Sequence, residues 1–278
     1  MYSRCYLKSA ATPPQNSHLN VCLLQDKSSR QSPKVDLPVV KWSFAIPARF
    51  NSEITPIVRD NQMKFYIDTA DLDELRVGAE MGVITGVTTN PTLIAKVSTD
   101  MPEKIRQICS IINGPIHAEP VSDSADAIIE EARMLTAIHD NVVAKIAMSE
   151  EGLKAVKVLS REGITCSVTL IFSAVQALLA AEAGAQYIIP FIGRLDDISN
   201  DGIMLSGEIR SLMDRYHPQV QVLAASIRHP MHIMEAARAG ADIVTAPLKV
   251  LKQLYRHPLT ERGLAQFKAD WEKVKSQK

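Results

Sequence analysis

The segment Val142-Val143-Ala144-Lys145-Ile146-Ala147 places a lysine inside a run of apolar and β-branched residues. Such a run is typical of a strand that is covered by helices on a parallel sheet. Burying a charged ammonium group there costs free energy unless a neighbouring group compensates. A buried lysine gives up its proton readily, and the neutral amine can then attack a carbonyl carbon. The alternative is that Lys145 lies at a strand end with its ammonium group in water.

The same pattern of short apolar runs and amphipathic segments continues from Met63 to the end of the chain. We predict strands at 64–68, 85–88, 115–121, 141–146, 165–169, 187–191, 220–225 and 242–246, each followed by a helix, and a last helix at 260–275. Eight such units require parallel strands, because each strand must cross back over a helix. We therefore predict an α/β fold, a closed (β/α)8 TIM barrel with an extra C-terminal helix. An open doubly wound sheet is the alternative, but no GxGxxG or GxxxxGK[ST] motif follows a strand.

Residues 1–62 differ from the rest of the chain in composition. They contain eight serines and six of the 15 prolines but no glycine, and they show no sustained period. We expect residues 1–62 to form a disordered N-terminal extension and 63–278 to form the catalytic barrel domain. A transit peptide fits the Ser-rich, acid-poor start, and so does a start codon assigned upstream of a true start at Met63.

Composition limits the classes of function. Hydrophobic residues make up 46% of the chain and charged residues 22%, which allows a sizeable core. The 31 basic and 31 acidic residues cancel, and aromatic residues are scarce at 5%, so we expect no nucleic-acid partner. We also expect no membrane partner, because no apolar stretch reaches spanning length. The four cysteines are widely spaced, which predicts a reducing compartment and hence a cytoplasmic protein.

Polar residues occupy the carboxyl ends of seven consecutive predicted strands. In TIM barrels these ends carry the active site. Each residue alone has an ordinary structural explanation, such as a helix cap for Asp68, a turn for Asn90 and a surface ion pair for Arg194. Their common placement around Lys145 favours one functional site. The candidates, in chain order, are Asp68, Asn90, Glu119, Lys145, Thr169, Phe191, Arg194, Ser226 and Arg228.

The candidate residues form a chemically coherent set. Lys145 can form a Schiff base with a ketone, which makes the adjacent carbon–carbon bond cleavable. Glu119 and Thr169 can move the required protons through a water, and Asp68 can accept the proton of the departing hydroxyl group. Two arginines and a serine form an anion site suited to a substrate phosphate: Arg194, Arg228 and Ser226. We expect no metal and no cofactor, because the histidines are scattered and no metal-binding motif is present.

From Met63 to Lys278 the chain resembles the small transaldolases, the branch that also contains fructose-6-phosphate aldolase. The matching segments occur in order along the barrel. They are Phe65-Tyr66-Ile67-Asp68-Thr69-Ala70, Gly86-Val87-Thr88-Thr89-Asn90-Pro91-Thr92-Leu93, Val168-Thr169-Leu170-Ile171-Phe172, Pro190-Phe191-Ile192-Gly193-Arg194-Leu195-Asp196-Asp197, Ala224-Ala225-Ser226-Ile227-Arg228-His229-Pro230 and Pro247-Leu248-Lys249-Val250.

The resemblance implies a role for each candidate. It implies that Lys145 is the Schiff-base lysine, Asp68 the acid/base, and Glu119 and Thr169 the pair that holds a water. It further implies that a substrate hydroxyl is bound by Asn90 and the phosphate by Arg194, Ser226 and Arg228. Glu119 and Phe191 stand where the aldolase branch carries Gln and Tyr, which favours group transfer. The implied reaction moves a dihydroxyacetone unit from sedoheptulose 7-phosphate or fructose 6-phosphate to an aldose phosphate, in the pentose phosphate pathway.

Three residues depart from the family pattern. Ala147 replaces a proline, which predicts a looser loop after the Lys145 strand. Pro120 removes a hydrogen-bond donor from the predicted third strand and is expected to shift Glu119. Ser167 replaces an asparagine, so we expect a substrate-facing hydroxyl group there. Two rival functions stay open. The first is a fructose-6-phosphate aldolase, against which Glu119 and Phe191 argue. The second is a catalytically silent barrel that binds sugar phosphates, for which Ala147 and Pro120 are the only support in the sequence.

The resemblance also implies a homo-oligomer, a pentamer or decamer in which the C-terminal helix packs on a neighbouring subunit. Phe267 and Trp271 give that helix an apolar face at i, i+4 spacing. Docking of this helix on its own barrel is the alternative.

Overall fold

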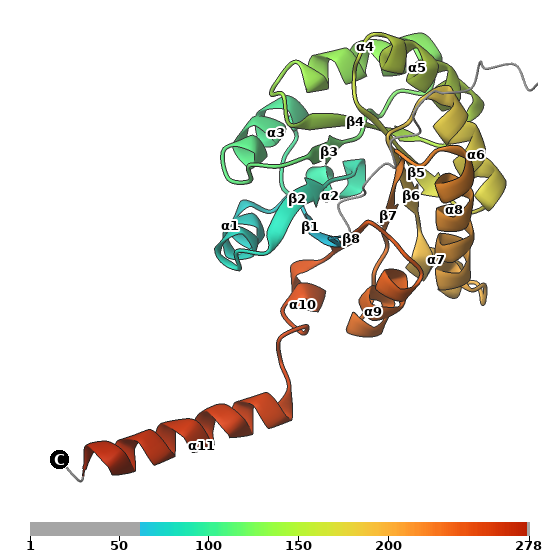
Figure 1. The fold of residues 1–278 in the computed structure, drawn as a ribbon. Helices are drawn as coiled ribbons and strands as arrows, with labels where there is room; N and C mark the ends of the chain where they lie inside the picture. The colour runs from blue at the N-terminus through green and yellow to red at the C-terminus, as the bar shows by residue number, and fades with distance from the viewer. Residues whose placement is uncertain (1–61, 277–278) are drawn as a thin grey trace, which may run out of the picture. The chain divides into compact units, whose positions relative to one another are not determined.

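Eight parallel strands close into a barrel in which each strand pairs with the next and β8 pairs with β1 (Figure 1). This computed structural model describes residues 62–276. The closed barrel confirms the predicted (β/α)8 fold and excludes the open sheet. The strands are β1 (Lys64–Asp68), β2 (Ile84–Thr88), β3 (Ile116–Ala118), β4 (Val142–Ala147), β5 (Cys166–Ile171), β6 (Tyr187–Pro190), β7 (Gln221–Ala224) and β8 (Ile243–Ala246).

The helices follow the strands in the predicted order and surround the barrel (Figure 1). Two short helices were not predicted, α2 and α7, and both follow directly after residues of the candidate site. Many helices begin directly after a Ser, Asp or Asn whose side-chain oxygen accepts a hydrogen bond from a backbone N–H group of the first turn. These caps explain where the helices begin. The helices are α1 (Leu72–Glu80), α2 (Pro91–Ala95), α3 (Met101–Cys109), α4 (Ala125–Thr136), α5 (Glu150–Arg161), α6 (Ala174–Ala183), α7 (Ile192–Asp196), α8 (Gly202–Tyr216), α9 (Pro230–Arg238), α10 (Leu248–Leu251) and α11 (Pro258–Lys275).

Three residues depart from the family pattern, and the backbone contradicts what we expected from two of them, Pro120 and Ala147. Strand β3 ends at Ala118, so Pro120 lies after the strand and removes no hydrogen bond from the ladder. Ala147 is the last residue of β4 and pairs with Thr169. The following Met148 N–H donates to the Thr169 carbonyl, and Ser149 caps α5. The connection after Lys145 is therefore short and held by hydrogen bonds rather than loose.

Two apolar layers lie between the strands and the helices, while the interior of the barrel holds a smaller, partly polar core. Tyr66, Ile189 and Leu223 belong to this interior core. The Tyr66 ring needs the space left by Gly86 on the neighbouring strand, because a Cβ there would lie 2.6 Å from the ring. Gly86 therefore makes the space that the Tyr66 ring fills inside the barrel.

The remaining predictions concern the N-terminal extension, the last helix and membrane spans. The predicted extension 1–62 lies almost entirely outside the described residues. The last helix, α11, buries none of its residues, so it does not dock on its own barrel in this structure. Within residues 62–276, no helix is long and apolar enough to cross a membrane.

Candidate active site

One cavity of about 180 Å³ lies at the carboxyl ends of the strands, where the candidate residues were predicted to meet. It is lined by seven of them: Asp68, Asn90, Lys145, Phe191, Arg194, Ser226 and Arg228. Thr88 and Thr245 line it as well. Residues from the first to the last strand therefore converge on one site, as the sequence pattern predicted.

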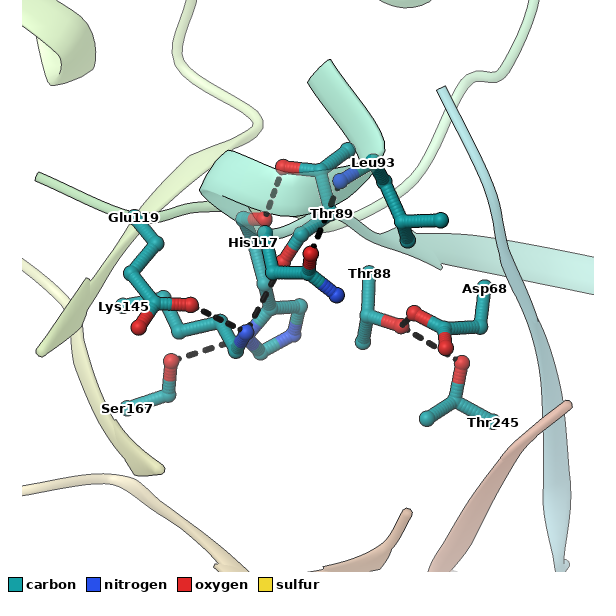
Figure 2. A network of polar contacts seen from close by, with 10 residues as sticks. Asp68, Thr88, Thr89, Leu93, His117, Glu119, Lys145, Ser167 and Thr245 are labelled. Carbon is teal, nitrogen blue, oxygen red and sulfur yellow. Dashed lines mark hydrogen bonds and ion pairs between the residues drawn. The ribbon is translucent and has the colours of Figure 1, made fainter. Parts of the chain in front are cut away.

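Lys145 is buried in the barrel, and its side chain is compensated by two acceptors. Its residue exposure is only 3%, which rules out the alternative of an ammonium group in water. The Nζ donates to Glu119 Oε2 over 2.6 Å and to the Thr89 carbonyl over 2.8 Å (Figure 2). Glu119 is joined to the site through this ion pair. A buried pair of this kind is costly to break, because either partner alone would leave an uncompensated charge.

Asp68 stands at the end of a chain of hydroxyl groups (Figure 2). Thr88 Oγ1 donates to Asp68 Oδ1 over 2.7 Å, and Thr88 Oγ1 also lies 2.7 Å from Thr245 Oγ1. Because Thr88 gives its proton to Asp68, Thr245 must donate to Thr88. Burial raises the pKa of the Asp68 carboxyl, while the Thr88 hydrogen bond and the Lys145 charge oppose this rise. The cap of α1 is Asp71, so the alternative of a helix cap for Asp68 is wrong.

Thr169 is the candidate least connected to the others. It lies on β5 beside Ala147, fully buried, and it is not among the cavity-lining residues. Its Oγ1 has no hydrogen-bond partner among the described residues. A buried hydroxyl group without a partner is unusual, and water commonly satisfies such groups. The placement of Thr169 is therefore compatible with the predicted water but does not bring its hydroxyl group to Lys145 directly.

The residues of the predicted anion site come from two elements. Arg194 lies on α7, with its Cζ 5.5 Å from the centre of the Phe191 ring. Arg228 follows β7, and its Nη2 lies 2.8 Å from Asp197 Oδ2. The predicted alternative of an ion pair for Arg194 with the following aspartates is thus not what the structure shows. Both arginines line the cavity. The Arg228 guanidinium group is paired with Asp197 through Nη2 and keeps its other N–H donors for an anion.

Asn90 caps a helix and also lines the cavity. Its Oδ1 accepts the Leu93 N–H and so caps α2, as expected for Asn before a proline. The residue also lines the cavity. The side-chain amide nitrogen is a donor that the cap does not use, so it is suited to a substrate oxygen.

A buried polar pair lies in the barrel interior beneath the cavity. His117 Nδ1 is 2.9 Å from Ser167 Oγ, and neither residue is exposed. The rings of Tyr66 and Tyr187 lie 5.8 Å and 4.9 Å from the His117 ring. Burial, and secondarily the Lys145 charge, lower the pKa of His117 to about 3. The expectation of a substrate-facing Ser167 is wrong, because this hydroxyl group pairs with His117 and does not line the cavity.

Sequence reasoning missed four residues of the site. They are Thr88, Thr89, His117 and Thr245, to which the sequence pattern assigned no role. The period-two alternation of strands would have found Thr88, which faces the same side as Gly86 and pairs with Asp68. The role of the Thr89 carbonyl is a backbone contact, which no side-chain pattern reveals. In residues 62–276 no cluster of three or more His, Cys, Asp or Glu side chains is arranged to hold a metal ion.

Comparison with known proteins agrees with this geometry. The sequence pattern of the family described as Transaldolase/Fructose-6-phosphate aldolase matches residues 65–278. A "Probable transaldolase" of Caldicellulosiruptor saccharolyticus is 57% identical over 213 residues, which cover 76% of this chain and 98% of the relative. One of Myxococcus xanthus is 56% identical over 213 residues, with coverages of 76% and 96%.

A solved structure shows the likeness of fold alone. The carboxyl transferase domain from Rhizobium etli pyruvate carboxylase, determined with 3-bromopyruvate, superposes with a TM-score of 0.53 at 11% identity. The match covers 68% of this chain and 40% of that chain. The extent of the family match and the identity to the curated relatives settle the assignment: the chain belongs to the transaldolase/fructose-6-phosphate aldolase family and is a transaldolase-type enzyme.

Proposed function

We propose that the protein is a transaldolase that moves a dihydroxyacetone unit from a ketose phosphate to an aldose phosphate through a Schiff base on Lys145. The donors are sedoheptulose 7-phosphate or fructose 6-phosphate, and the reaction belongs to the pentose phosphate pathway. The observation that carries the proposal concerns Lys145. Its buried ammonium group pairs with Glu119, and the residue lines the same cavity as Asp68. No metal or cofactor takes part in the proposed steps.

Schiff-base formation begins with a proton transfer. Lys145 passes a proton to Glu119, 2.6 Å away, and its neutral amine attacks the ketose C2 carbonyl carbon. One proton moves from the attacking nitrogen to the carbonyl oxygen to give the carbinolamine. A second proton lets the resulting hydroxyl group leave as water, so the carbinolamine becomes an iminium. The Glu119 carboxyl group supplies this proton, with Thr169 holding the water that relays it. Thr169 is opposite Ala147, two residues beyond the pairing of Ser167 with Lys145, and this position on the neighbouring strand supports the assignment.

Carbon–carbon cleavage requires a base at the C4 hydroxyl group of the donor. Asp68 accepts that proton, the C3–C4 bond breaks, and its electron pair moves to the iminium nitrogen to give an enamine. The raised pKa of Asp68 favours its holding the proton until the acceptor arrives. The hydroxyl groups of Thr88 and Thr245 orient the carboxylate through the chain of hydrogen bonds described above.

Phe191 at the cavity wall favours transfer of the three-carbon unit over its release as free dihydroxyacetone. Phe191 has no hydroxyl group with which to protonate the enamine, so the three-carbon unit waits for an aldehyde. The enamine carbon then attacks the acceptor carbonyl, and Asp68 returns its proton to the new hydroxyl group. Water finally hydrolyses the iminium and restores Lys145. Arg194, Arg228 and Ser226 bind the phosphate of donor and acceptor in turn.

The test is borohydride trapping with fructose 6-phosphate, followed by peptide mass mapping. The proposal predicts a reduced sugar adduct on Lys145 and a turnover that depends on an added aldose phosphate. Release of free dihydroxyacetone without an acceptor would identify a fructose-6-phosphate aldolase instead. A folded protein that binds the sugar phosphate but gives no adduct would identify the silent barrel.

We also propose that the protein is a homo-oligomer, a pentamer or decamer held in part by α11. The apolar side chains of this helix recur with spacings of three and four residues, as in an interface helix. They are largely exposed: Leu264 63%, Phe267 73%, Trp271 61% and Val274 47%. A second copy of the chain is the proposed partner, because α11 buries none of its own residues. Light scattering behind size-exclusion chromatography tests this, and a monomer would contradict it.

The proposed compartment is the cytoplasm. The two cysteines in the described part of the chain, Cys109 and Cys166, are free thiols. Free thiols are the usual state in a reducing compartment. Fractionation of cells that express the full chain tests this proposal, and recovery in an organelle fraction would contradict it.

A further inference from the structure

The two arginines of the anion site lie on separate elements, so something must hold these elements in register. Arg194 is on α7, and Arg228 is in the connection between β7 and α9. Both side chains line the cavity but are exposed at its rim. A single phosphate can be bound by both only if α7 and the connection keep a fixed distance. This inference rests on the proposed phosphate-binding function of that site.

His232 joins these two elements through opposite edges of one buried ring. The residue lies in the first turn of α9 and is 6% exposed. Its Nδ1 accepts the backbone N–H of Arg228 over 3.3 Å. Its Nε2 lies 2.9 Å from Asp196 Oδ2, at the end of α7. Because Nδ1 accepts, the proton of the neutral ring is on Nε2 and is donated to Asp196.

A second contact leaves the two elements little freedom to move apart or together. The Gly193 N–H on α7 donates to the Ser226 carbonyl over 3.1 Å. A Cβ at Gly193 would lie 2.2 Å from that oxygen and 2.7 Å from Arg228 Cγ, so only glycine allows this approach. Asp196 is itself held, since its Oδ1 accepts the Gly202 N–H at the start of α8 over 3.2 Å. The hydrogen bonds of His232 therefore act on a closely packed junction.

We propose that His232 is a positioning residue of the phosphate site, which sets the affinity for the phosphorylated end of the sugar without touching it. The ring fixes the backbone of Arg228 relative to the helix that carries Arg194. Its hydrogen bonds run to Arg228 and Asp196 and not to Lys145 or Asp68, so the carbon chemistry does not depend on it directly.

Burial is the main reason why the His232 ring stays in the neutral form that this arrangement requires. Burial lowers the pKa of His232, and the neighbouring His229 and Arg228 lower it further. Asp196 and Glu235 act in the opposite direction. The rings of His229 and His232 are 3.8 Å apart, but His229 is exposed and caps α9 by accepting the His232 N–H. His229 therefore offers a matched control on the same helix.

The experiment compares His232→Ala, His232→Gln and Asp196→Ala with the control His229→Asn in the full chain. Steady-state kinetics are measured with fructose 6-phosphate and with unphosphorylated fructose as donors, together with inhibition by inorganic phosphate. We expect His232→Ala and Asp196→Ala to raise KM for fructose 6-phosphate and Ki for phosphate about tenfold, the effect of one lost buried charged hydrogen bond. We expect kcat, and kcat/KM for fructose, to stay within about twofold.

The remaining variants separate a specific contact from a general loss of structure. The side-chain amide introduced by His232→Gln retains a donor for Asp196, so this variant should lose less than His232→Ala. The control His229→Asn should behave as the unmodified protein. Equal losses for both donors, or folded variants with unchanged KM and Ki, would overturn the inference. If His232→Ala does not fold, the inference is tested with Asp196→Ala and His232→Gln, again by the changes in KM for fructose 6-phosphate and in Ki for phosphate. A failure of the proposed function is distinct, because the unmodified protein would then give no Lys145 adduct and no inhibition by phosphate.

Discussion

Acid sensitivity of folding should depend on the buried His117. The perturbation is His117→Asn, which keeps a polar group near Ser167 Oγ but removes the titrating ring. In the folded protein, burial and the Lys145 charge lower the pKa of His117 to about 3, from an ordinary value of 6.5. Between these two values the unfolded chain binds a proton at this position and the folded protein does not. The stability contributed by the neutral ring is therefore complete above pH 6.5 and is lost progressively as the pH falls towards 3.

The size of the effect follows from the gap between the two pKa values. Each pH unit below 6.5 removes about 1.4 kcal/mol of unfolding free energy until the folded ring titrates. Between about pH 8 and about pH 5 the His117 contribution therefore amounts to about 2 kcal/mol. That is a large part of a total stability of about 5–15 kcal/mol, so the transition midpoint should move visibly. The variant also loses ring packing, but that loss does not change with pH.

The assay is urea unfolding of both proteins at about pH 8 and about pH 5, followed by far-ultraviolet circular dichroism. Trp271 is too exposed to report on the barrel by fluorescence. The useful quantity is the difference in unfolding free energy between the two proteins, since other titrating groups cancel in it. We expect that difference to shrink by about 2 kcal/mol on acidification. A difference that stays constant would show that His117 titrates alike in the folded and unfolded states, and would refute the reasoning from burial.

Four further outcomes are expected. Lys145→Met should reduce turnover by at least about a thousandfold while fructose 6-phosphate binding remains measurable by calorimetry; retained turnover would contradict the Schiff-base assignment. Phe191→Tyr should raise the release of free dihydroxyacetone relative to transfer at least about tenfold in a coupled assay, because the cavity gains an acid, and an unchanged ratio would count against the proposed role of Phe191. Ser226, whose φ is 61°, should gain about 1 kcal/mol of stability on replacement by Gly while KM for fructose 6-phosphate rises, as urea unfolding and kinetics would show; a loss of stability would contradict the strain. Trp271→Glu should lower the oligomer mass measured by light scattering, and an unchanged mass would exclude α11 from the interface.

Much of the candidate site was predictable because a closed barrel of parallel strands brings residues that are spaced along the sequence onto one ring. Once the strands are parallel and closed, every residue at a carboxyl strand end lies on the same rim. Asp68, Lys145 and Arg228 could thus be grouped without any knowledge of distances. The same logic did not reveal which acceptors compensate Lys145, since the Thr89 carbonyl is part of the backbone.

Other features escaped prediction because they depend on contacts between distant residues. Ser167 was expected to face the substrate, but its direction is decided by His117, fifty positions away in the chain. Pro120 was expected to disturb β3, but the strand ends two residues earlier. Strand ends depend on where neighbouring strands stop pairing, which local sequence does not determine.

By itself, the sequence determined the eight strand–helix units, their order and the strand ends at which the charged residues gather, and it favoured a closed barrel over an open sheet. The periodicity of hydrophobic residues is a local property that identifies each strand and helix. The rules for connecting parallel strands then leave few possible topologies. Only the tertiary structure decided the pairing of Lys145 with Glu119, the hydroxyl chain behind Asp68 and the His232 contact between the two arginine-bearing elements. Those are matters of direction and distance between side chains from different strands, and they are set by packing of the whole barrel rather than by any segment of it.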